Sequence, residues 1–447
     1  MTEILDQTDL TERAERLVAA ARKAGADAAD AVCVRGISLS VDVRLGKVEE
    51  TRRAEGDDFS LRAFVGRRSA SVSANVLTDP AELAERAVAM AKVAPEDRFA
   101  GLAEPQTLAT RFADLDLLDA VMPSADELTQ AALAVEDAAR AVPGVTNSGG
   151  ASADWGLGGL VLATSGGFAG SYLGSRFGLG ASAIAGLGTA MERDYDGESK
   201  VFRADLADPE VIGRNAGERA VHRLNPRQIA TGRVTVVYDP RVAVGLVGHL
   251  AGAINGAAIA RKTSFLRDKL GQQLFPATLR ISDDPLRPRG LGSRPFDGEG
   301  VAGSALDVVE GGVLKTWLLD SATGRELGLA TNGRASRRGG NPSPGSTNLT
   351  LLPGSQTPEE LIAGIDRGIY VTELIGHGVN MNTGDYSRGV AGFAIVNGEI
   401  GLPVSEITIA GNLIDMYRVL LVANDLTYRY ATNAPTLAVE GMTVAGS

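Results

Sequence analysis

The N-terminal part of the chain alternates between two spacings of apolar residues. Thr11–Lys23 carries Leu17, Ala20 and Ala21 on one side at helical spacing, which predicts an amphipathic helix. A second helix is expected to begin at Asp79, because this helix-capping residue is followed by a proline that fits the first turn. The segments between the two helices alternate apolar and polar residues, which predicts strands. These strands are Ile37–Val43, Lys47–Arg53, Phe59–Val65 and Ser69–Val76.

The same order of patterns returns further along the chain. A helix is predicted for Ala125–Ala141, and another begins at Asp208, which again precedes a proline. Glycine-rich strand candidates lie between these helices, at Gly159–Thr164, Gly167–Leu173 and Arg176–Ala185. We therefore expect an N-terminal α+β domain over residues 1–230, built from two related helix–antiparallel sheet–helix units of about 1–100 and 120–230.

A boundary near Ala230–Arg233 separates this domain from residues 231–447. A short apolar strand, Val234–Tyr238, leads into Val242–Ala260, which carries no formal charge and follows another Asp-Pro pair. Its length allows a membrane span, but its apolar residues are mostly alanine and valine, so a buried helix of a soluble core is the preferred interpretation. Its glycines lie three or four residues apart, so we expect one face that a neighbouring backbone approaches closely. They are Gly245, Gly248, Gly252 and Gly256.

The rest of the C-terminal domain is predicted to be rich in strands. Ala305–Val309 and Val313–Leu319 flank a glycine turn, and Ala391–Val396 precedes an Asn-Gly pair, the usual signal of a tight hairpin. Thr357 begins a short helix with a capping box that ends at Glu360.

The basic cluster Arg334–Gly340 is followed by a run rich in proline and glycine. Such residues favour loops, so we expect an exposed, mobile segment here. Contact with an acidic surface of a partner is the alternative interpretation.

The composition narrows the class of partners. A net charge of −11 and a pI near 5.0 argue against a phosphate-binding surface, so direct binding of nucleic acid is not expected. The single cysteine, Cys33, cannot form an intrachain disulfide, and the acidic N-terminus has no apolar signal core. Both features favour the cytoplasm, without membrane attachment. The glycines of Gly149–Gly188 lack the lysine-containing signature of a phosphate loop and indicate tight bends or close backbone contacts.

The segment Gly376–Met416 combines glycine turns, isolated polar residues and short apolar runs, in the sequence GHGVNMNTGDYSRGVAGFAIVNGEIGLPVSEITIAGNLIDM. It resembles the C-terminal region of the TldD/PmbA family and, within that family, the PmbA branch, also called TldE. The resemblance covers nearly the whole chain. It implies a two-part subunit that forms dimers with a large internal cavity, a link to zinc-dependent proteolysis of unfolded peptides, and an older description as a modulator of DNA gyrase.

The resemblance directs attention to the helix predicted over Val242–Ala260. TldD-type members carry there a His-Glu-x-x-x-His motif for zinc and its general base, and a cysteine near the C-terminus is the third ligand. The corresponding positions in this chain are His249, Leu250 and Ile254 in one frame, and Gly248, His249 and Ala253 in the other.

Neither frame supplies two imidazoles and a carboxylate. The other histidines, His222 and His377, and the cysteine, Cys33, lie in distant segments. We therefore expect no catalytic residue, metal site or cofactor in this chain, with zinc held by a TldD-type partner in a heterodimer, and we interpret His249 as a core imidazole. The alternatives are a self-sufficient metalloprotease with unrecognised zinc ligands and a non-catalytic peptide-binding or modulator homodimer.

The loop within the family-like segment is the candidate for contact with a peptide or a partner subunit. His377 lies between two glycines, and Asn380, Asp385 and Arg388 follow closely. We expect this loop to border an exposed strand edge at which unfolded peptides add as strands. The alternative is a satisfied turn, in which Asp385 caps backbone amides and pairs with Arg388.

Overall fold

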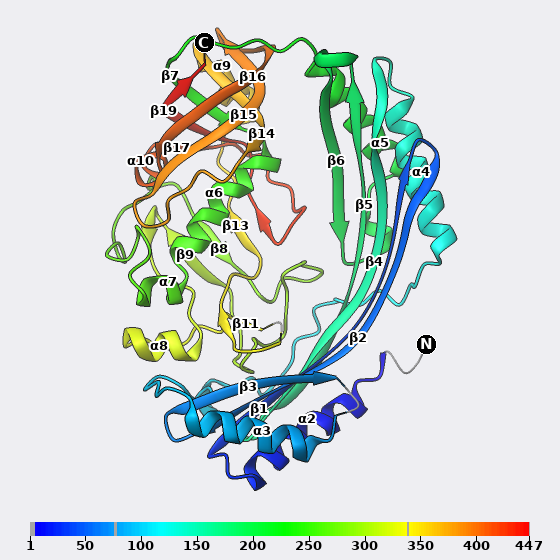
Figure 1. The fold of residues 1–447 in the computed structure, drawn as a ribbon. Coiled ribbons are helices and arrows are strands. Elements are labelled where there is room, and N and C mark those ends of the chain that lie inside the picture. Colours follow the sequence, from blue (N-terminus) through cyan, green and yellow to red (C-terminus); the bar gives the residue numbers. More distant parts are fainter. Residues whose placement is uncertain (1–4, 76–77, 338, 447) are drawn as a thin grey trace.

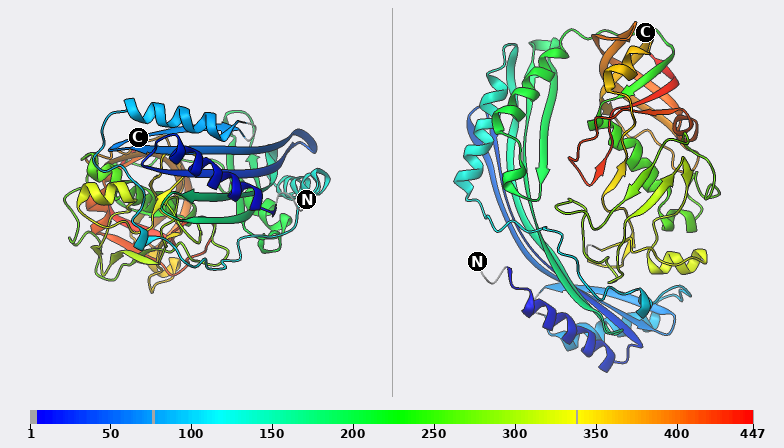
Figure 2. Two further views of the ribbon diagram at one scale, coloured as in Figure 1. Left: turned by 90° about the horizontal axis from the view of Figure 1, so that it is seen from below. Right: turned by 180° about the vertical axis from the view of Figure 1, so that it is seen from behind.

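The computed structural model describes residues 5–75, 78–337 and 339–446. Its N-terminal part is a long curved sheet, and the C-terminal part lies within the hollow of that curve (Figure 1). The view from behind shows the same arrangement, with the helices of the N-terminal part on the outer side of the sheet (Figure 2).

The N-terminal sheet has six antiparallel strands in the order β3-β2-β1-β4-β5-β6. Its strands are β1 (Ala28–Arg44), β2 (Lys47–Val65), β3 (Arg68–Asn75), β4 (Val145–Thr164), β5 (Ala169–Ala185) and β6 (Glu192–Lys200). Its helices are α2 (Thr8–Lys23), α3 (Pro80–Val93), α4 (Ala125–Arg140) and α5 (Pro209–His222). In chain order, a helix, three strands and a helix occur twice. The predicted α+β class and its duplicated helix–sheet–helix organisation are therefore confirmed.

Alternate residues of the strands face the helices, as the period of a strand requires. Leu39, Trp155 and Leu179 are buried in a core with α4 and α5, and Ala31 and Leu61 are buried in a core with α2 and α3. The opposite, concave face of the sheet is turned toward the C-terminal part (Figure 1).

The glycine-rich strands are longer than their sequence predicts. β4 begins at Val145, well before the predicted Gly159–Thr164, and β5 joins two predicted strands into one. The pattern is hidden because alanines such as Ala151 and Ala153 occupy buried positions of β4 where larger apolar residues would signal a strand. The last residue of the strand predicted over Ser69–Val76 lies outside the described residues.

The C-terminal part is rich in strands, as expected. One sheet has the order β16-β15-β14-β7-β19-β17 and is closed by an additional pairing of β16 with β19, a second has the order β10-β9-β8-β13-β18, and β11 pairs with β12. The strands are β7 (Gly232–Tyr238), β8 (Ile281–Asp283), β9 (Leu306–Glu310), β10 (Val313–Leu314), β11 (Ala335–Ser336), β12 (Ser343–Pro344), β13 (Leu349–Leu351), β14 (Arg367–Ile375), β15 (Asp385–Val396), β16 (Glu399–Asn412), β17 (Leu420–Val422), β18 (Thr432–Asn433) and β19 (Leu437–Ala445). The helices are α6 (Pro240–Ala253), α7 (Gly256–Ala260), α8 (Ser321–Leu327), α9 (Pro358–Ala363) and α10 (Leu413–Arg418). Short 3-10 helices occur at Pro105–Thr107, Gly188–Ala190 and Arg203–Asp205.

The charge-free segment forms two helices where the sequence pattern predicts one. α6 ends at Ala253, and the side chain of Asn255 caps α7 by accepting a hydrogen bond from Ala257 N at 3.0 Å. The break therefore comes from a local capping interaction. Within the described part of the chain, no helix combines the length and apolarity that crossing a membrane requires.

The expected close backbone approach to the glycine face is wrong for three of the four glycines. Gly248 is exposed, and nothing lies within 4 Å of a Cβ built on it, while Gly245 and Gly252 meet only side-chain atoms. Gly256 differs, because its Cβ position is 2.8 Å from the carbonyl oxygen of Leu318. The apolar side of α6 is buried instead, so this helix is amphipathic although Arg241, in its first turn, is its only charged residue.

The prediction of an exposed, mobile loop at Arg334–Gly340 is also wrong. Arg334 is fully buried and its Nη2 donates to Asp283 O at 2.9 Å. Arg337 is buried as well, and its Nη2 donates to Asp30 Oδ1 at 2.6 Å. The partners of both guanidinium groups come from distant segments, which a local pattern cannot reveal. Residue 338 lies outside the described residues.

Candidate functional site

The step from β7 to α6 is fixed by polar contacts at the start of the helix. Asp239 caps α6 by accepting a hydrogen bond from Arg241 N at 2.9 Å, and the phenol of Tyr370 donates to its other oxygen at 3.0 Å. The buried Arg241 donates through Nη1 to Asp194 of β6 at 2.8 Å. This ion pair ties the beginning of α6 to the edge strand of the N-terminal sheet.

His249 lies in the middle of α6 and is only partly buried. Its ring centroid is 6.1 Å from that of Tyr386, in an edge-to-face arrangement. Burial, and then the positive charge of Arg388, lowers the pKa of His249. The imidazole is therefore neutral at pH 7, and a nearby guanidinium opposes the approach of a metal cation.

The loop between β14 and β15 and the start of β15 hold the four residues predicted to contact a peptide or a partner. His377, Asn380 and Asp385 are exposed and Arg388 is partly exposed. The structure brings Asn380 and Asp385 together, because Asn380 N donates to Asp385 O at 2.9 Å. Arg388 lies across the base of the loop, where its Nε donates to Ile375 O at 3.4 Å.

Asp385 is satisfied locally, as the alternative interpretation expects. It accepts hydrogen bonds from Thr383 Oγ1 at 2.7 Å and from Asn412 Nδ2 at 3.3 Å. These two contacts lower the pKa of the Asp385 carboxyl. The expected pair with Arg388 is not found among the described residues, because both belong to β15, where residues three apart face opposite sides of the sheet.

The exposed strand edge that we expected beside this loop is also absent from the described residues. β14 and β15 are interior strands of their sheet. The loop instead packs against α6, since Met381 Cε lies 3.3 Å from the position that a Cβ on Gly252 would take. One turn of α6, the loop and Arg388 thus form a single surface around His249.

Sequence reasoning separated His249 from the loop and missed the two residues that connect them. Met381 and Tyr386 both lie inside the family-like segment, flanking its turn residues. Their apolar and aromatic character next to such turn residues is the signal that could have indicated packing against another element.

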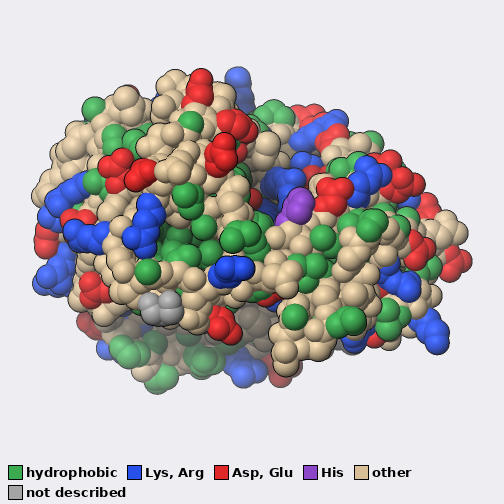
Figure 3. Space-filling model, turned by 90° about the horizontal axis from the view of Figure 1, so that it is seen from above, with side chains coloured by type: hydrophobic (Ala, Val, Ile, Leu, Met, Phe, Trp, Pro, Cys, Tyr) green, Lys and Arg blue, Asp and Glu red, His purple; other side chains and the backbone are tan. Residues whose placement is uncertain are grey.

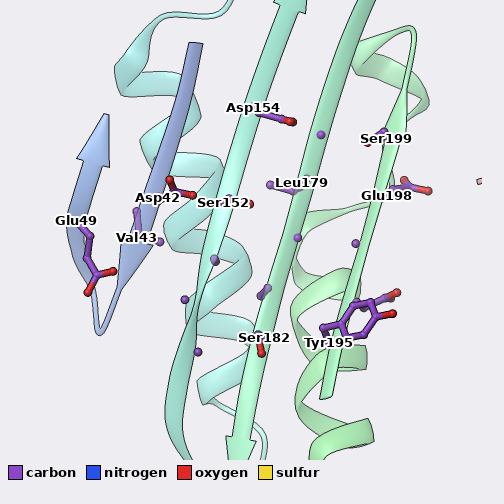
Figure 4. Close-up of a pocket in the computed structure, with 18 of the residues that line it drawn as sticks. Asp42, Val43, Glu49, Ser152, Asp154, Leu179, Ser182, Tyr195, Glu198 and Ser199 are labelled. Carbon is purple, nitrogen blue, oxygen red and sulfur yellow. The ribbon is translucent and has the colours of Figure 1, made fainter. Parts of the chain in front are cut away.

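The concave face of the N-terminal sheet carries a second candidate surface, a hollow of about 700 Å³. Strands β4, β5 and β6 form its floor, and carboxylates line it, as the side chains of Asp42, Glu49 and Asp154 illustrate (Figure 4). Gly178 makes room for the Asp154 carboxylate, whose Oδ2 lies 1.9 Å from the position that a Cβ would take. Burial raises the pKa of Asp154. The sequence pattern did not predict this hollow.

A neighbouring hollow of about 630 Å³ lies where the same sheet faces the C-terminal part around Gly290–Ser293. Its floor includes a row of glycines that pair across four adjacent strands. They are Gly56, Gly36, Gly158 and Gly174. The backbone of the sheet is therefore accessible where the two parts of the molecule face each other.

Comparison with known proteins identifies the relatives of this architecture. Three family models match in succession: PmbA/TldA metallopeptidase domain 1 over residues 29–91, the central domain over 120–224 and the C-terminal domain over 231–446. A "Metalloprotease PmbA homolog" from Haemophilus influenzae is 37% identical, with 99% of this chain and 97% of that protein covered. "Metalloprotease PmbA" from Escherichia coli O157:H7 is 36% identical over 94% and 92%. The chain belongs to the PmbA/TldD family.

The PmbA/TldD fold extends through the whole chain. A crystal structure described as a putative modulator of DNA gyrase, from Bacteroides thetaiotaomicron, is 28% identical and has a TM-score of 0.91. The alignment covers 99% of this chain and 100% of that one. The family expected from the segment Gly376–Met416 is therefore confirmed.

The matching domain models are named metallopeptidase domains. The positions that correspond to the zinc motif of TldD-type members lie at α6, so zinc binding depends on the side chains present there. Leu250, Ala253 and Ile254 are buried apolar residues, and Gly248 has no side chain, so these positions offer no donor atoms. Throughout the described residues, no three side chains of His, Cys, Asp and Glu gather as a metal site requires. The residues on α6 do not fit a zinc ion.

Charge is distributed evenly over one large face of this PmbA/TldD protein. Seen from above, basic side chains are interspersed with acidic ones and form no extended patch (Figure 3). A phosphate backbone is bound through clustered lysine and arginine residues, so this face does not have the character of a nucleic-acid surface.

Proposed function

We propose that this chain is a PmbA/TldE-type subunit of a metalloprotease system that degrades or trims unfolded peptides in the cytoplasm, and that a TldD-type partner supplies the catalytic zinc. In this proposal the chain contributes a wall of the chamber and a surface for the peptide. It acts without direct contact with nucleic acid or membrane.

The proposal rests on the side chains of α6, which apart from His249 lack the nitrogen, sulfur and oxygen atoms that bind zinc in proteins. Where a hydrolytic zinc needs three protein ligands and an open position, this helix offers His249 beside apolar residues and a glycine. Arg388 adds a positive charge next to that imidazole. A helix with this composition suits a subunit that positions substrate for chemistry performed elsewhere.

The concave face supports a role in holding peptides. Unfolded peptides share only their backbone, so a general binder gains most from main-chain hydrogen bonds. The two hollows, of about 700 and 630 Å³, are floored by glycine and serine residues that leave strand backbone accessible. His377, Asn380, Asp385 and Arg388 form the candidate rim on the C-terminal part, next to α6.

The two alternatives make different demands on the chain. A self-sufficient metalloprotease needs zinc ligands outside α6, and a stand-alone peptide-binding or modulator homodimer needs no zinc at all. Both are separated from the partner model by metal content and by activity measured with and without a TldD-type homologue.

The decisive experiment measures cleavage of an unfolded peptide by the purified chain, by a TldD-type homologue that carries His-Glu-x-x-x-His, and by their mixture. We expect the chain alone to contain no stoichiometric zinc and to be inactive, and the mixture to cleave in a chelator-sensitive manner. A His249→Ala variant should leave the activity of the mixture intact. Zinc-dependent cleavage by the chain alone, abolished in that variant, would overturn the proposal.

Failure of the chain to bind or stimulate the homologue, together with tight binding of unfolded peptide, would favour the stand-alone binder. Peptide binding is measured by fluorescence anisotropy with a labelled unfolded peptide, so this outcome is separable from the activity measurement.

A further inference from the structure

A small cavity of about 290 Å³ lies where the end of β6 faces the C-terminal part of the molecule. Its other walls come mainly from the loop that follows β8 and the loop that precedes β18. The cavity shares Ser199, a residue of β6 (Figure 4), and Tyr430 with the hollow of about 700 Å³. It shares Gly290 and Leu291 with the hollow of about 630 Å³. The cavity therefore adjoins both hollows of the concave face.

Four basic side chains line this cavity, and three of them already have acidic partners. The nitrogen–oxygen distances of these ion pairs lie between 2.6 and 3.4 Å. The charges of these three cations are therefore compensated within the chain. The pairs are Lys200 with Glu198, Arg289 with Asp116 and Asp205, and Arg429 with Asp196.

Arg287 is the fourth basic residue, and within the described part of the chain its guanidinium forms no ion pair and donates no hydrogen bond. It lies over the ring of Tyr428, with Cζ 3.1 Å from the ring centroid. The carboxylate of Asp284 accepts a hydrogen bond from Leu286 N at 2.9 Å instead. Burial lowers the pKa of Arg287 more than Tyr428 and Asp284 raise it. The stacked ring fixes the plane of the guanidinium and leaves its N–H groups for another partner.

An uncompensated guanidinium in a partly buried cavity favours an anionic ligand. The planar fork of arginine matches carboxylate and phosphate groups, each through two parallel hydrogen bonds. A single positive charge matches a carboxylate better than a doubly charged phosphate. The volume of about 290 Å³ corresponds to roughly ten water molecules. This space is enough for the last residue of a peptide or for one acidic side chain.

The adjoining hollow of about 700 Å³ has the opposite charge preference. Carboxylates line it, among them Asp42, Glu49 and Asp154, and no lysine or arginine of the described residues does so. A negatively charged group of a peptide is therefore disfavoured in that hollow. A peptide that extends from the hollow into the cavity brings such a group to Arg287.

We propose that the cavity of Arg287 binds a carboxylate of a peptide held on the concave face. This inference deepens the proposed function and rests on it, because the ligand is the same unfolded peptide. The carboxylate comes either from the C-terminus of the peptide or from an aspartate or glutamate side chain. Main-chain hydrogen bonds are indifferent to the side chains of the peptide, so an anchor at Arg287 adds a selectivity that the sheet alone does not provide.

Three forms of one labelled unfolded peptide test the carboxylate. The first has a C-terminal amide and no acidic residue, the second has a free C-terminus, and the third has the amide and one glutamate. Binding to the purified chain is measured by fluorescence anisotropy. We expect a peptide with a carboxylate to bind about tenfold more tightly than the first, since charge-assisted hydrogen bonds contribute this much or more. The form that gains affinity identifies the source of the carboxylate.

Two arginine variants test the site. Arg287→Gln removes the charge of the cavity, so we expect it to abolish the advantage of the carboxylate and to leave binding of the first peptide unchanged. Arg280→Gln is the matched control, because it removes the same charge from a mostly exposed side chain that pairs with Asp307 at 2.7 Å. This control should keep the tenfold difference. Thermal unfolding reports whether each variant is folded, and the comparison of the peptides on the wild type needs no variant.

Binding of N-acetylglycine separates this inference from the proposed function. The probe carries a terminal carboxylate without an extended chain, and N-acetylglycinamide is its neutral control. By saturation-transfer NMR we expect N-acetylglycine to bind the wild type and Arg280→Gln but not Arg287→Gln. If no unfolded peptide binds while N-acetylglycine does, the role in holding peptides fails and the carboxylate site stands.

Three results overturn the inference. The first is equal binding of the three peptides to the wild type. The second is a preference for the carboxylate that survives in Arg287→Gln. The third is a wild type that does not bind N-acetylglycine.

Discussion

Asp30 of β1 and Arg337 form a buried ion pair across 307 positions of the chain, with Nη2 of the arginine 2.6 Å from Oδ1 of the aspartate. Arg62 of β2 donates to the other oxygen of Asp30, through Nε at 3.0 Å. Burial alone would raise the pKa of Asp30, but Arg337 and Arg62 outweigh it and lower the pKa of this carboxyl. The pair fastens the start of β1 to the segment that follows β11, as the pair of Arg241 and Asp194 fastens the start of α6 to β6.

Replacing Asp30 by Asn should lower the free energy of unfolding by about 3–5 kcal/mol, because two guanidinium groups stay buried without their carboxylate. The measurement is urea unfolding followed by circular dichroism. Asp9→Asn is the matched control, since Asp9 pairs with Arg35 at 3.1 Å but is mostly exposed. A surface pair of this kind contributes only about 0–1 kcal/mol. Equal losses of stability from the two substitutions would show that the buried ion pair of Asp30 contributes no more than the exposed pair of Asp9.

Glu299 makes stability depend on pH. It is buried, and Ser321 N donates to its Oε2 at 2.8 Å. Burial, and then the charge of Asp297, raises its pKa to about 7, against roughly 4.3 in an unfolded chain. The stability that the protonated carboxyl contributes is complete below pH ~4.3 and is lost as pH rises toward ~7. Glu299→Gln should therefore stabilise the protein most at pH 8 and little at pH 4.5, measured by urea unfolding at both values.

The contribution of Glu136 to stability should depend on pH in the opposite direction, because its pKa is lowered in the folded protein. Burial would raise its pKa, but hydrogen bonds from Ser148, Gly46 and Leu45 lower it. Its contribution is present above the unfolded pKa and is lost as pH falls through the folded one. Glu136→Gln should destabilise the protein at pH 8, by roughly 1–3 kcal/mol for the lost charge-assisted hydrogen bonds, and the difference should narrow in acid. A parallel pH dependence of the two variants would contradict both assignments.

Two glycines of neighbouring helices should respond oppositely to alanine. Gly248 is exposed within α6 with no atom near its Cβ position, so Gly248→Ala should raise the free energy of unfolding by about 0.5–1 kcal/mol. Gly256→Ala places a methyl group 2.8 Å from the carbonyl oxygen of Leu318 and should cost about 1–3 kcal/mol. Thermal or urea unfolding distinguishes the two, and a loss at Gly248 would show that this side of α6 is covered.

Removing the charge of Arg388 should move the pKa of His249 upward, because Arg388 disfavours the imidazolium. The chain has three histidines, so an NMR titration resolves them, and His249→Ala assigns the signal. Arg388→Ala should shift this signal alone. Asp385→Asn is the control from the same loop. An unchanged His249 titration in Arg388→Ala would place the guanidinium away from the ring.

Local chemistry is what the sequence predicts well. The helix caps at Asp79, Asp208, Asp239 and Thr357 all accept the expected backbone hydrogen bonds, because capping depends only on residues a few positions apart. The duplicated α+β organisation follows from these caps and from the alternation of apolar residues between them.

The predictions that are wrong concern contacts between segments distant in the sequence. Arg334 and Arg337 have the composition of a mobile loop, and their burial depends on Asp283 and Asp30, which local spacing does not connect to them. The spacing of the glycines shows that they share a face of α6, but which segments pack against that face depends on the tertiary structure. For the same reason, the sequence gives no sign that His249 lies beside the loop of His377, although Arg388 and Tyr386 bring the loop to the imidazole.

The ion pair of Asp30 has a consequence for the order of events during synthesis. A ribosome adds ~5–20 residues per second, so roughly 15–60 s pass between the synthesis of Asp30 and that of Arg337. During that interval the inner face of the nascent sheet carries charges that only the later half of the chain can cover. The N-terminal sheet can therefore form its helix-covered cores early, but its buried ion pair with the C-terminal part forms only once Arg337 has been made.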